Sequence, residues 1–488
     1  MHEVTRSETP GAWEHAVRTR LVSGERFCGV LAREGSEAVS LRAFFDRRGV
    51  LEAEELVVER QVGRYPSLTS LTPAAAWYER QVEDLYGLVA AGKEDREPLV
   101  TRLRFRAGGE LSEALVSGAT EETLRDGSFV VPYGPVRSGV FESIQYEVTT
   151  SGENVERVRP AVWFKHRGVH ARFEGASVAD AVLLAERSEG VASVAHALAF
   201  SHAVERLVDG GVPVPAGLVR VIHAELERVA NHVDSVVRHA EAAGQAVAYA
   251  NLSLRKEHVQ RLRADLCGNR FGRSVVIPGG VTGEPRVDPV DLRRAVDSLA
   301  RALDQDLRAL LETPSFVDRL RGTGTLSLDT VRRFAAVGPV ARGSGVTDDV
   351  RMLRPYDAYP TLGQVVVEYP SEGDALARQI VRVHEIDASF HTIRQAIEQL
   401  AGFSSGQERS WRREISLVDG EAIGWAEAPQ GELLYVVELE NGVVRTVASR
   451  SASFHNLALF PSAFPRDVFT DFAFIEASFG LSIAGVAN

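Results

Sequence analysis

The sequence predicts an α+β protein in which a small N-terminal α+β domain precedes a large domain with a helical bundle core and peripheral β-hairpins. Three observations support this fold class. Short alternating segments and one amphipathic helix occupy the first residues, apolar residues then recur at three- and four-residue steps over 177–272, and alternation returns over 415–447. The 488 residues are 44% hydrophobic and 25% charged, which is ordinary globular composition.

The N-terminal domain is predicted from strands at 26–31 and 40–45 and a helix at 76–86. The stretch 117–127 is polar, is bounded by turn residues and has no apolar period, which is typical of a linker. We therefore expect a first domain over 1–116, a linker over 117–131 and a second domain over 132–488.

The second domain is expected to begin with a hairpin, because segments 141–148 and 157–164 alternate around a turn at 151–154. Helical periodicity then predicts the bundle, and the dipeptide Asn441-Gly442 predicts a second hairpin near the C-terminal end. The expected helices are 193–208, 218–243, 252–267, 289–311 and 374–401.

Two sets of polar residues lie at helical spacing. Charged residues fall on one stripe of the last of these helices, which favours a solvated face and leaves open a surface that docks a partner. The stripe is Asp374, Arg378, Arg382 and Glu385. A second set, Glu225, Arg228 and His232, favours a hydrogen-bonded network inside the bundle over a catalytic role.

Composition excludes several functions. The net charge of -12 argues against nucleic-acid binding, and no apolar run reaches the roughly 18 residues of a membrane span. The N-terminus lacks the pattern of a secretory signal, so we expect the protein to stay inside the cell. Cys28 and Cys267 show no metal-ligand spacing, and no glycine-rich dinucleotide fingerprint follows a strand.

A long string at 65–87, YPSLTSLTPAAAWYERQVEDLYG, resembles the C subunit of respiratory complex I, which is its small hydrophilic subunit without a cofactor. An amphipathic helix alone accounts for the pattern of this string but not for its residues. The resemblance implies that the N-terminal domain adopts the fold of that small protein.

The rest of the chain resembles the large subunit that complex I, where it is the D subunit, shares with the nickel-iron hydrogenases. The motifs are KHRG at 165–168, AER at 185–187, RVIHAELERVANH at 220–232, RKE at 255–257, GNR at 268–270, PGGV at 278–281 and EAPQGE at 427–432. A C-like domain fused to a D-like domain is the arrangement of group 4 hydrogenases of the formate hydrogenlyase type.

The resemblance also shows what is missing. In the hydrogenases four cysteines hold nickel and iron, and the matching positions here are Glu189, Ala192, Leu481 and Ala484. Alkyl groups and one carboxylate cannot replace the thiolates, so we expect no metal centre and no hydrogen activation. The quinone-binding Tyr and His of complex I are absent as well, which makes quinone binding doubtful.

Six residues are candidates for lining a redox cavity: Arg137, His166, Arg167, Arg187, Glu189 and Glu427. His166 and Arg167 could orient a buried carboxylate or face an iron-sulfur cluster of a partner. Glu189 could couple its protonation to electron arrival, with an ion pair to Arg187 or another arginine as the alternative. No cofactor-binding residue is identified.

The resemblance implies a peripheral-arm subunit that couples electron transfer, with NADH or quinone as candidate reactants of the complex, to ion translocation. The alternative is a non-catalytic scaffold, so whether the chain takes part in catalysis stays open. The expected partners are a small iron-sulfur protein like the B subunit of complex I, which would carry the cluster, and antiporter-like membrane subunits. We expect the chain at the cytoplasmic side of the cell membrane.

Overall fold

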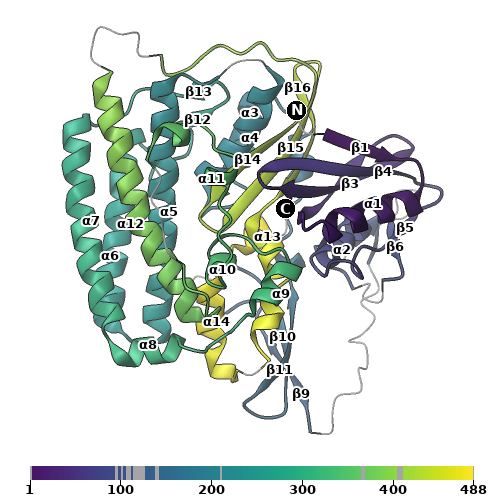
Figure 1. The fold of residues 1–488 in the computed structure, drawn as a ribbon, viewed down its shortest axis with the longest axis horizontal. Coiled ribbons are helices and arrows are strands. Elements are labelled where there is room, and N and C mark those ends of the chain that lie inside the picture. Colours follow the sequence, from purple (N-terminus) through teal and green to yellow (C-terminus); the bar gives the residue numbers. More distant parts are fainter. Residues whose placement is uncertain are drawn as a thin grey trace.

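A computed structural model describes residues 3–93, 97–100, 103–105, 111–113, 127–137, 142–208, 211–363, 369–403, 410–465 and 467–486. Figure 1 shows a sheet with two helices at one side of the molecule and a bundle of long helices at the other. The mixture of helices and sheets confirms the predicted α+β class. No helix in the described part of the chain is both long enough and apolar enough to cross a bilayer.

The N-terminal region is a four-stranded sheet with the order β1-β4-β3-β2, in which β1 runs parallel to β4. The predicted strands lie inside β2 and β3, and the predicted helix is α2. The elements are β1 (Glu3–Ser7), α1 (Pro10–Val22), β2 (Arg26–Glu34), β3 (Ala38–Arg47), β4 (Val50–Glu59), β5 (Arg64–Pro66), α2 (Ala75–Tyr86), β6 (Val89–Ala91), β7 (Leu103–Phe105) and β8 (Leu111–Glu113).

A three-stranded sheet, β11-β10-β9, follows. Strands β10 (Gln145–Thr150) and β11 (Val155–Ala161) pair antiparallel as the predicted hairpin, and β9 (Phe129–Tyr133) pairs with β10. The predicted linker lies outside the described residues over 117–126, and β9 begins within the remainder of that range. The boundaries of the two domains stay a prediction.

The bundle consists of the five predicted helices, and two of them, α5 and α6, begin earlier than expected, by four and six residues. They are α4 (Ser193–Leu207), α5 (Val214–Ala242), α6 (Ala246–Cys267), α7 (Pro289–Leu311) and α12 (Ala375–Gly402). Gly268 ends α6 in the left-handed conformation, and Asp288 caps the start of α7. Shorter elements around the bundle are α3 (Val178–Ala185), β12 (Val276–Ile277), β13 (Gly280–Val281), α8 (Pro314–Leu320), α9 (Leu328–Arg333), α10 (Gly338–Arg342) and α11 (Val350–Leu353).

A third sheet, β14-β15-β16, packs against α4. Its strands are β14 (Gly420–Ala428), β15 (Gly431–Glu440) and β16 (Val443–Arg450), and α13 (Ala452–Leu457) and α14 (Phe472–Phe479) follow. Asn441 and Gly442 both have positive φ and turn β15 into β16, which confirms the predicted second hairpin.

The C-terminal segment and the N-terminal region share one hydrophobic core. Tyr78 of α2 stacks edge-on against Phe454, with 5.0 Å between ring centroids, and its hydroxyl is 2.7 Å from Nδ1 of His455. The same cluster of buried residues includes Trp13 and Ile483. The first and last parts of the sequence therefore pack as one body.

The charged stripe of α12 is buried, so the prediction of a solvated face is wrong. Arg378 donates to the carbonyl oxygens of Gly373 and Gly324, and Glu385 accepts from Arg342 and stands 2.8 Å from His232 Nε2. The stripe faces α5 and α14, which bury it. The network predicted around Glu225, Arg228 and His232 is present inside the bundle.

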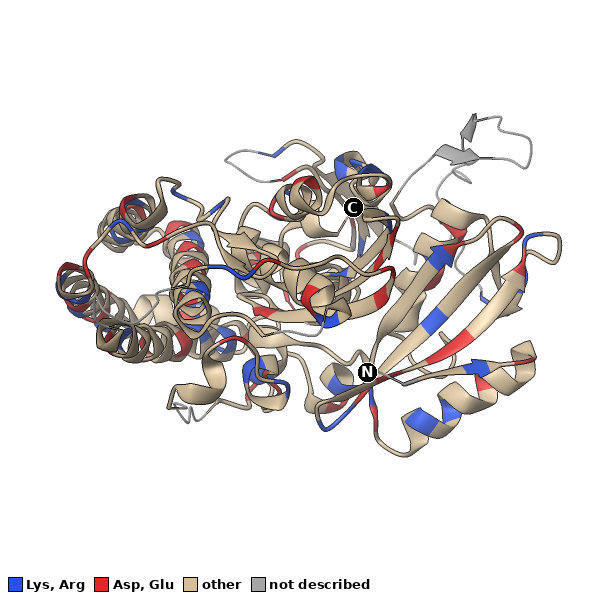
Figure 2. Ribbon diagram, turned by 90° about the horizontal axis from the view of Figure 1, so that it is seen from above, with Lys and Arg blue, Asp and Glu red and all other residues tan. Residues whose placement is uncertain are grey.

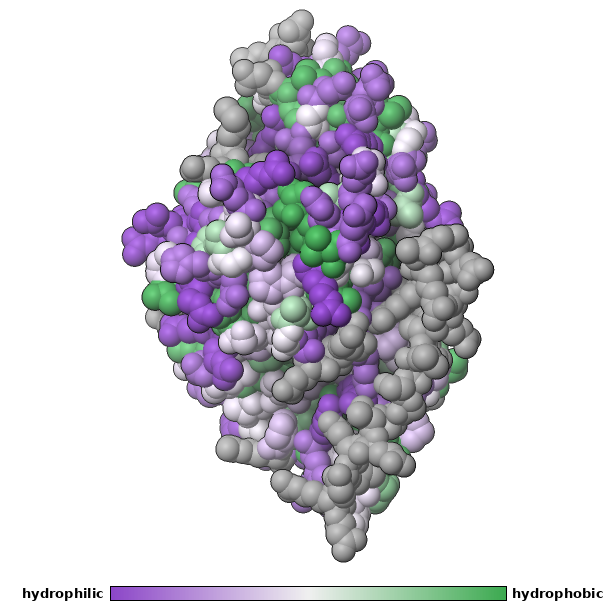
Figure 3. All heavy atoms as spheres, turned by 90° about the vertical axis from the view of Figure 1, so that its right-hand side faces the viewer, coloured by the Kyte–Doolittle hydropathy of each residue, from purple (hydrophilic) through white to green (hydrophobic). Residues whose placement is uncertain are grey.

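Acidic and basic residues are interspersed along the elements of both regions (Figure 2). The face formed by the N-terminal side of the molecule is largely hydrophilic, with a small apolar patch (Figure 3).

Candidate functional site

The loop after α3 and the C-terminal segment meet at one place, as the resemblance implies for the four former thiolate positions. The guanidinium of Arg167 ties the two segments together. It donates to the carbonyl oxygens of Arg187 at 2.9 Å, Ser188 at 2.6 Å and Ala484 at 3.0 Å. Arg167 therefore bonds to main-chain oxygens of both segments.

Glu189 fills the space between these two segments. Its side chain is buried, and a Cβ added at Gly485 would collide with its carboxylate. Its Oε2 lies 3.4 Å from Nε2 of His196. The carboxylate nearest to the Arg187 guanidinium is that of Glu186, at 3.9 Å, so the alternative pairing of Glu189 with Arg187 is wrong.

A line of polar groups continues from Glu189 into the core. Nδ1 of His196 is 2.7 Å from the hydroxyl of Tyr435, which in turn lies 3.4 Å from the hydroxyl of Ser188. Burial raises the pKa of Tyr435, so this hydroxyl keeps its proton at physiological pH. The other carboxylate oxygen, Oε1 of Glu189, has no hydrogen-bond partner among the described residues.

The residues at this place do not fit a nickel-iron centre. Ala192 and Ala484 are buried alkyl groups, and Leu481 supplies only a hydrocarbon side chain. Cys28 lies in β2 and Cys267 ends α6, far along the chain from both segments. Within the described residues, no three side chains of His, Cys, Asp or Glu gather as a metal site. These two segments therefore offer no thiolate donor for nickel and iron.

A cavity of about 230 Å³, which we call the Arg137 cavity, lies beside this filled place. Arg137 forms a two-pronged ion pair with Glu476, at 2.7 and 2.9 Å, and its guanidinium stands 5.3 Å from the centroid of the Tyr146 ring. Val191 and Leu481 also line the cavity. Its wall therefore combines a compensated charge with apolar surface.

Three lining residues were missed by sequence reasoning. Glu142 accepts hydrogen bonds from the Ser482 hydroxyl at 3.0 Å and the Ala484 N–H at 2.7 Å, while Glu476 binds Arg137. Arg238, of α5, completes the set. For Glu142 and Glu476 the only signal was an acidic residue in a largely apolar stretch, because the partners that they bind lie more than 300 residues away.

Two predicted site residues lie elsewhere. His166 lines a separate cavity of about 320 Å³ between the N-terminal sheet and β14–β16. Glu427 binds Arg342 and accepts from the Val350 N–H at 3.1 Å, deep between α11 and β14. Burial, together with the neighbouring Asp349 carboxylate, raises the pKa of Glu427.

A third predicted residue, Arg187, donates from its guanidinium to the Leu183 carbonyl oxygen, and its side chain is half exposed.

Near this junction, the carboxyl group of Glu186 has a pKa close to neutral pH. It is buried, and its Oε1 accepts the Ser274 N–H at 2.6 Å. Burial, the largest cause, raises the pKa of Glu186 to about 7, and the carboxylate of Glu227 adds to the rise. Glu227 itself accepts the Val194 and Ala195 N–H groups and so caps α4.

Comparison with known families gives two matches that together cover most of the chain. Residues 37–109 match the model of the respiratory-chain NADH dehydrogenase 30 Kd subunit, and residues 243–487 match that of the 49 Kd subunit.

The similar proteins include a subunit of an NADH-quinone oxidoreductase, a subunit of formate hydrogenlyase and a hydrogenase. The D subunit of the NADH-quinone oxidoreductase of Chlorobaculum parvum is 28% identical over 75% of this chain and 94% of its own. Formate hydrogenlyase subunit 5 of Escherichia coli is 26% identical over 77% of this chain and 68% of its own. The carbon monoxide-induced hydrogenase of Rhodospirillum rubrum is 30% identical over 65% of this chain and 87% of its own. The chain therefore belongs to the family of the 49 Kd subunit of the respiratory-chain NADH dehydrogenase, fused behind a 30 Kd subunit domain.

Proposed function

We propose that this chain is a fused peripheral-arm subunit of a membrane-bound oxidoreductase complex related to complex I and the group 4 hydrogenases, and that it works there without a nickel-iron centre. One observation carries the proposal. Arg167 and Glu189 occupy the junction between the two segments that would hold the metals, and they bond to the protein's own backbone and to His196.

In this role the chain takes part in coupling electron transfer to ion translocation, with an iron-sulfur cluster supplied by a partner. Exposed apolar side chains near the Arg137 cavity support a partner there, since Val136 is 88% exposed and Val191 is 36% exposed while it lines the cavity. The partner we propose is a small iron-sulfur subunit, and antiporter-like subunits would hold the assembly at the cytoplasmic side of the membrane.

The alternative function is a scaffold that docks the iron-sulfur subunit onto the membrane subunits without chemistry of its own. The filled junction around Glu189 favours this alternative. The Arg137 cavity favours a redox role, because a space of about 230 Å³ with a buried ion pair persists beside the junction.

Purification of the native complex through a tag on this chain tests the proposal. We expect an iron-sulfur protein and membrane subunits to co-purify, with iron but no stoichiometric nickel by elemental analysis. Nickel bound to this chain, or hydrogen uptake by it, would overturn the proposal.

A cavity-filling variant separates the two functions. Leu481→Trp places an indole in the Arg137 cavity, and Leu417→Trp, at an exposed position, is its matched control. A redox role predicts that only the first variant lowers electron transfer through an intact complex. Equal turnover of the two variants would favour the scaffold.

A further inference from the structure

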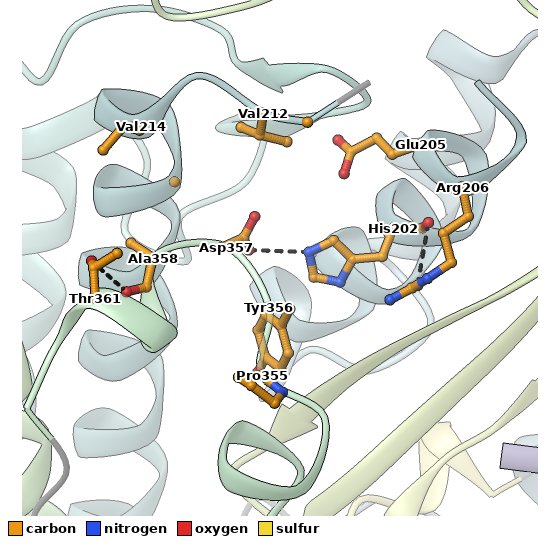
Figure 4. Close-up of a pocket in the computed structure, with 12 residues that line it drawn as sticks. His202, Glu205, Arg206, Val212, Val214, Pro355, Tyr356, Asp357, Ala358 and Thr361 are labelled. Atoms are coloured by element: carbon orange, nitrogen blue, oxygen red, sulfur yellow. Dashed lines mark hydrogen bonds and ion pairs between the residues drawn. The ribbon is translucent and has the colours of Figure 1, made fainter. Parts of the chain in front are cut away.

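A second cavity, of about 370 Å³, lies at the C-terminal end of α4, and we call it the His202 cavity (Figure 4). Its walls come from the end of α4, the first turn of α5 and the loop before the 3-10 turn at Tyr359–Thr361. Because α4 has 15 residues at about 1.5 Å each, roughly 20 Å of helix separates this cavity from the Glu189 junction. The lining residues of the two cavities do not overlap.

The two carboxylates of the wall are compensated from behind. Arg220, which is fully buried, donates to Glu205 at 2.5 Å and to Asp357 at 2.9 Å. The Gly279 N–H also donates to Glu205, at 2.7 Å. Both carboxylates are therefore already paired with a buried cation.

Both ring nitrogens of His202 face hydrogen-bond acceptors. Its Nδ1 lies 2.7 Å from the main-chain oxygen of Trp425, and its Nε2 lies 3.1 Å from a carboxylate oxygen of Asp357. A carbonyl oxygen and a carboxylate can only accept, so both ring nitrogens must carry hydrogen for both contacts to be hydrogen bonds. Figure 4 shows the imidazole edge turned toward Asp357.

Arg206 stands at the mouth of the cavity with no acid to balance it. Its guanidinium donates to the carbonyl oxygens of Ile423 at 3.0 Å and His202 at 3.4 Å, and it stacks 3.5 Å from the centroid of the Trp425 ring. No carboxylate of the described residues forms an ion pair with it. Arg220 lies behind the wall and pairs with both acids, which leaves Arg206 as a cation of the wall without an ion pair among the described residues.

We propose that the His202 cavity binds a small organic monocarboxylate, whose charge pairs with Arg206. The single unpaired charge of Arg206 calls for one negative charge. A dianion would bring its second charge toward Glu205 and Asp357, where like charges repel, so phosphate and dicarboxylates fit less well.

The remaining walls suit a short apolar body. Val212, Val214, Pro355 and Ala358 contribute hydrocarbon surface, and the Tyr356 ring covers one side. The volume of the cavity is at the lower end of the range for ligand pockets, which limits the ligand to a small molecule. A carboxylate of three to five carbons can place its acid group beside Arg206 at the mouth and its hydrocarbon chain against the apolar walls.

Titration of the full chain with butyrate, followed by calorimetry and by ligand-observed NMR, tests this site. We expect saturable one-to-one binding that succinate and phosphate do not match. Arg206→Gln should weaken butyrate binding at least about tenfold, since it removes a charge-assisted contact. The exposed Arg301 of α7 supplies the control, and Arg301→Gln should bind butyrate like the parent protein.

A second variant keeps the test independent of the charge. Val214→Trp, at an exposed position of the rim, should block the cavity and abolish binding without disturbing the core. Absence of butyrate binding to the folded parent, equal displacement by chloride, or unchanged affinity in both variants would overturn the proposal. The site does not depend on the function proposed for the chain, because these measurements need no partner subunit.

Discussion

The two ends of helix α4 use charged side chains in opposite ways. At its start, Arg167 and Glu189 are bound to the chain itself and close the space between two segments. At its end, His202 and Arg206 border a cavity, and Arg206 forms no ion pair with a described residue. The comparison teaches that charged side chains can close the space between two segments, because a guanidinium satisfies main-chain oxygens of both and a buried carboxylate fills the volume beside it.

Gly485→Ala should break the closed end most severely. The new Cβ collides with the Glu189 side chain, so we expect a loss of about 3 kcal/mol in the free energy of unfolding. Chemical denaturation measures this loss. In the Glu189→Ala background the same substitution should cost much less, and equal costs in the two backgrounds would show that Glu189 does not fill the junction.

Arg167→Gln should loosen the same end. It removes a charged donor from three carbonyl oxygens, and we expect a loss of about 2 kcal/mol in the free energy of unfolding. The exposed neighbour Arg172 serves as the control, and Arg172→Gln should change stability little. Limited proteolysis measures locally how well the C-terminal segment is held. Identical cleavage patterns in both variants would contradict the role of Arg167 in holding this segment.

The pH dependence of stability sharpens the comparison at Glu186. Its pKa rises from 4.5 to about 7 on folding, so its stabilising contribution is complete below pH 4.5 and is lost as the pH rises to about 7. Glu186→Gln should therefore match the parent near pH 5 and exceed it by about 2 kcal/mol at pH 8, after allowance for solvent screening. Parallel stability curves for the two proteins would contradict this assignment.

Arg206→Gln, at the open end, should have the smallest effect. Without ligand, we expect a change of about 0.5 kcal/mol in the free energy of unfolding, because the side chain lies at the cavity mouth and pairs with no acid. The same substitution at Arg167 thus provides a direct contrast. A loss at Arg206 as large as that at Arg167 would remove the difference between the two ends.

Sequence reasoning predicted the helices and hairpins well, because local periodicity and turns such as Asn441-Gly442 determine them. It failed on the stripe of Arg378 and Glu385, since periodicity cannot distinguish a solvated face from one that a later helix covers. It also missed Glu142 and the contact of His202 with Asp357. Those contacts join residues that only the tertiary fold brings together.

The core that α2 shares with the C-terminal segment affects how the polypeptide matures. The contacts of Tyr78 with Phe454 and His455 can form only after nearly the whole chain has been synthesised. A nascent N-terminal region therefore emerges from the ribosome with one apolar flank uncovered, and it depends on the last-made residues to cover that flank.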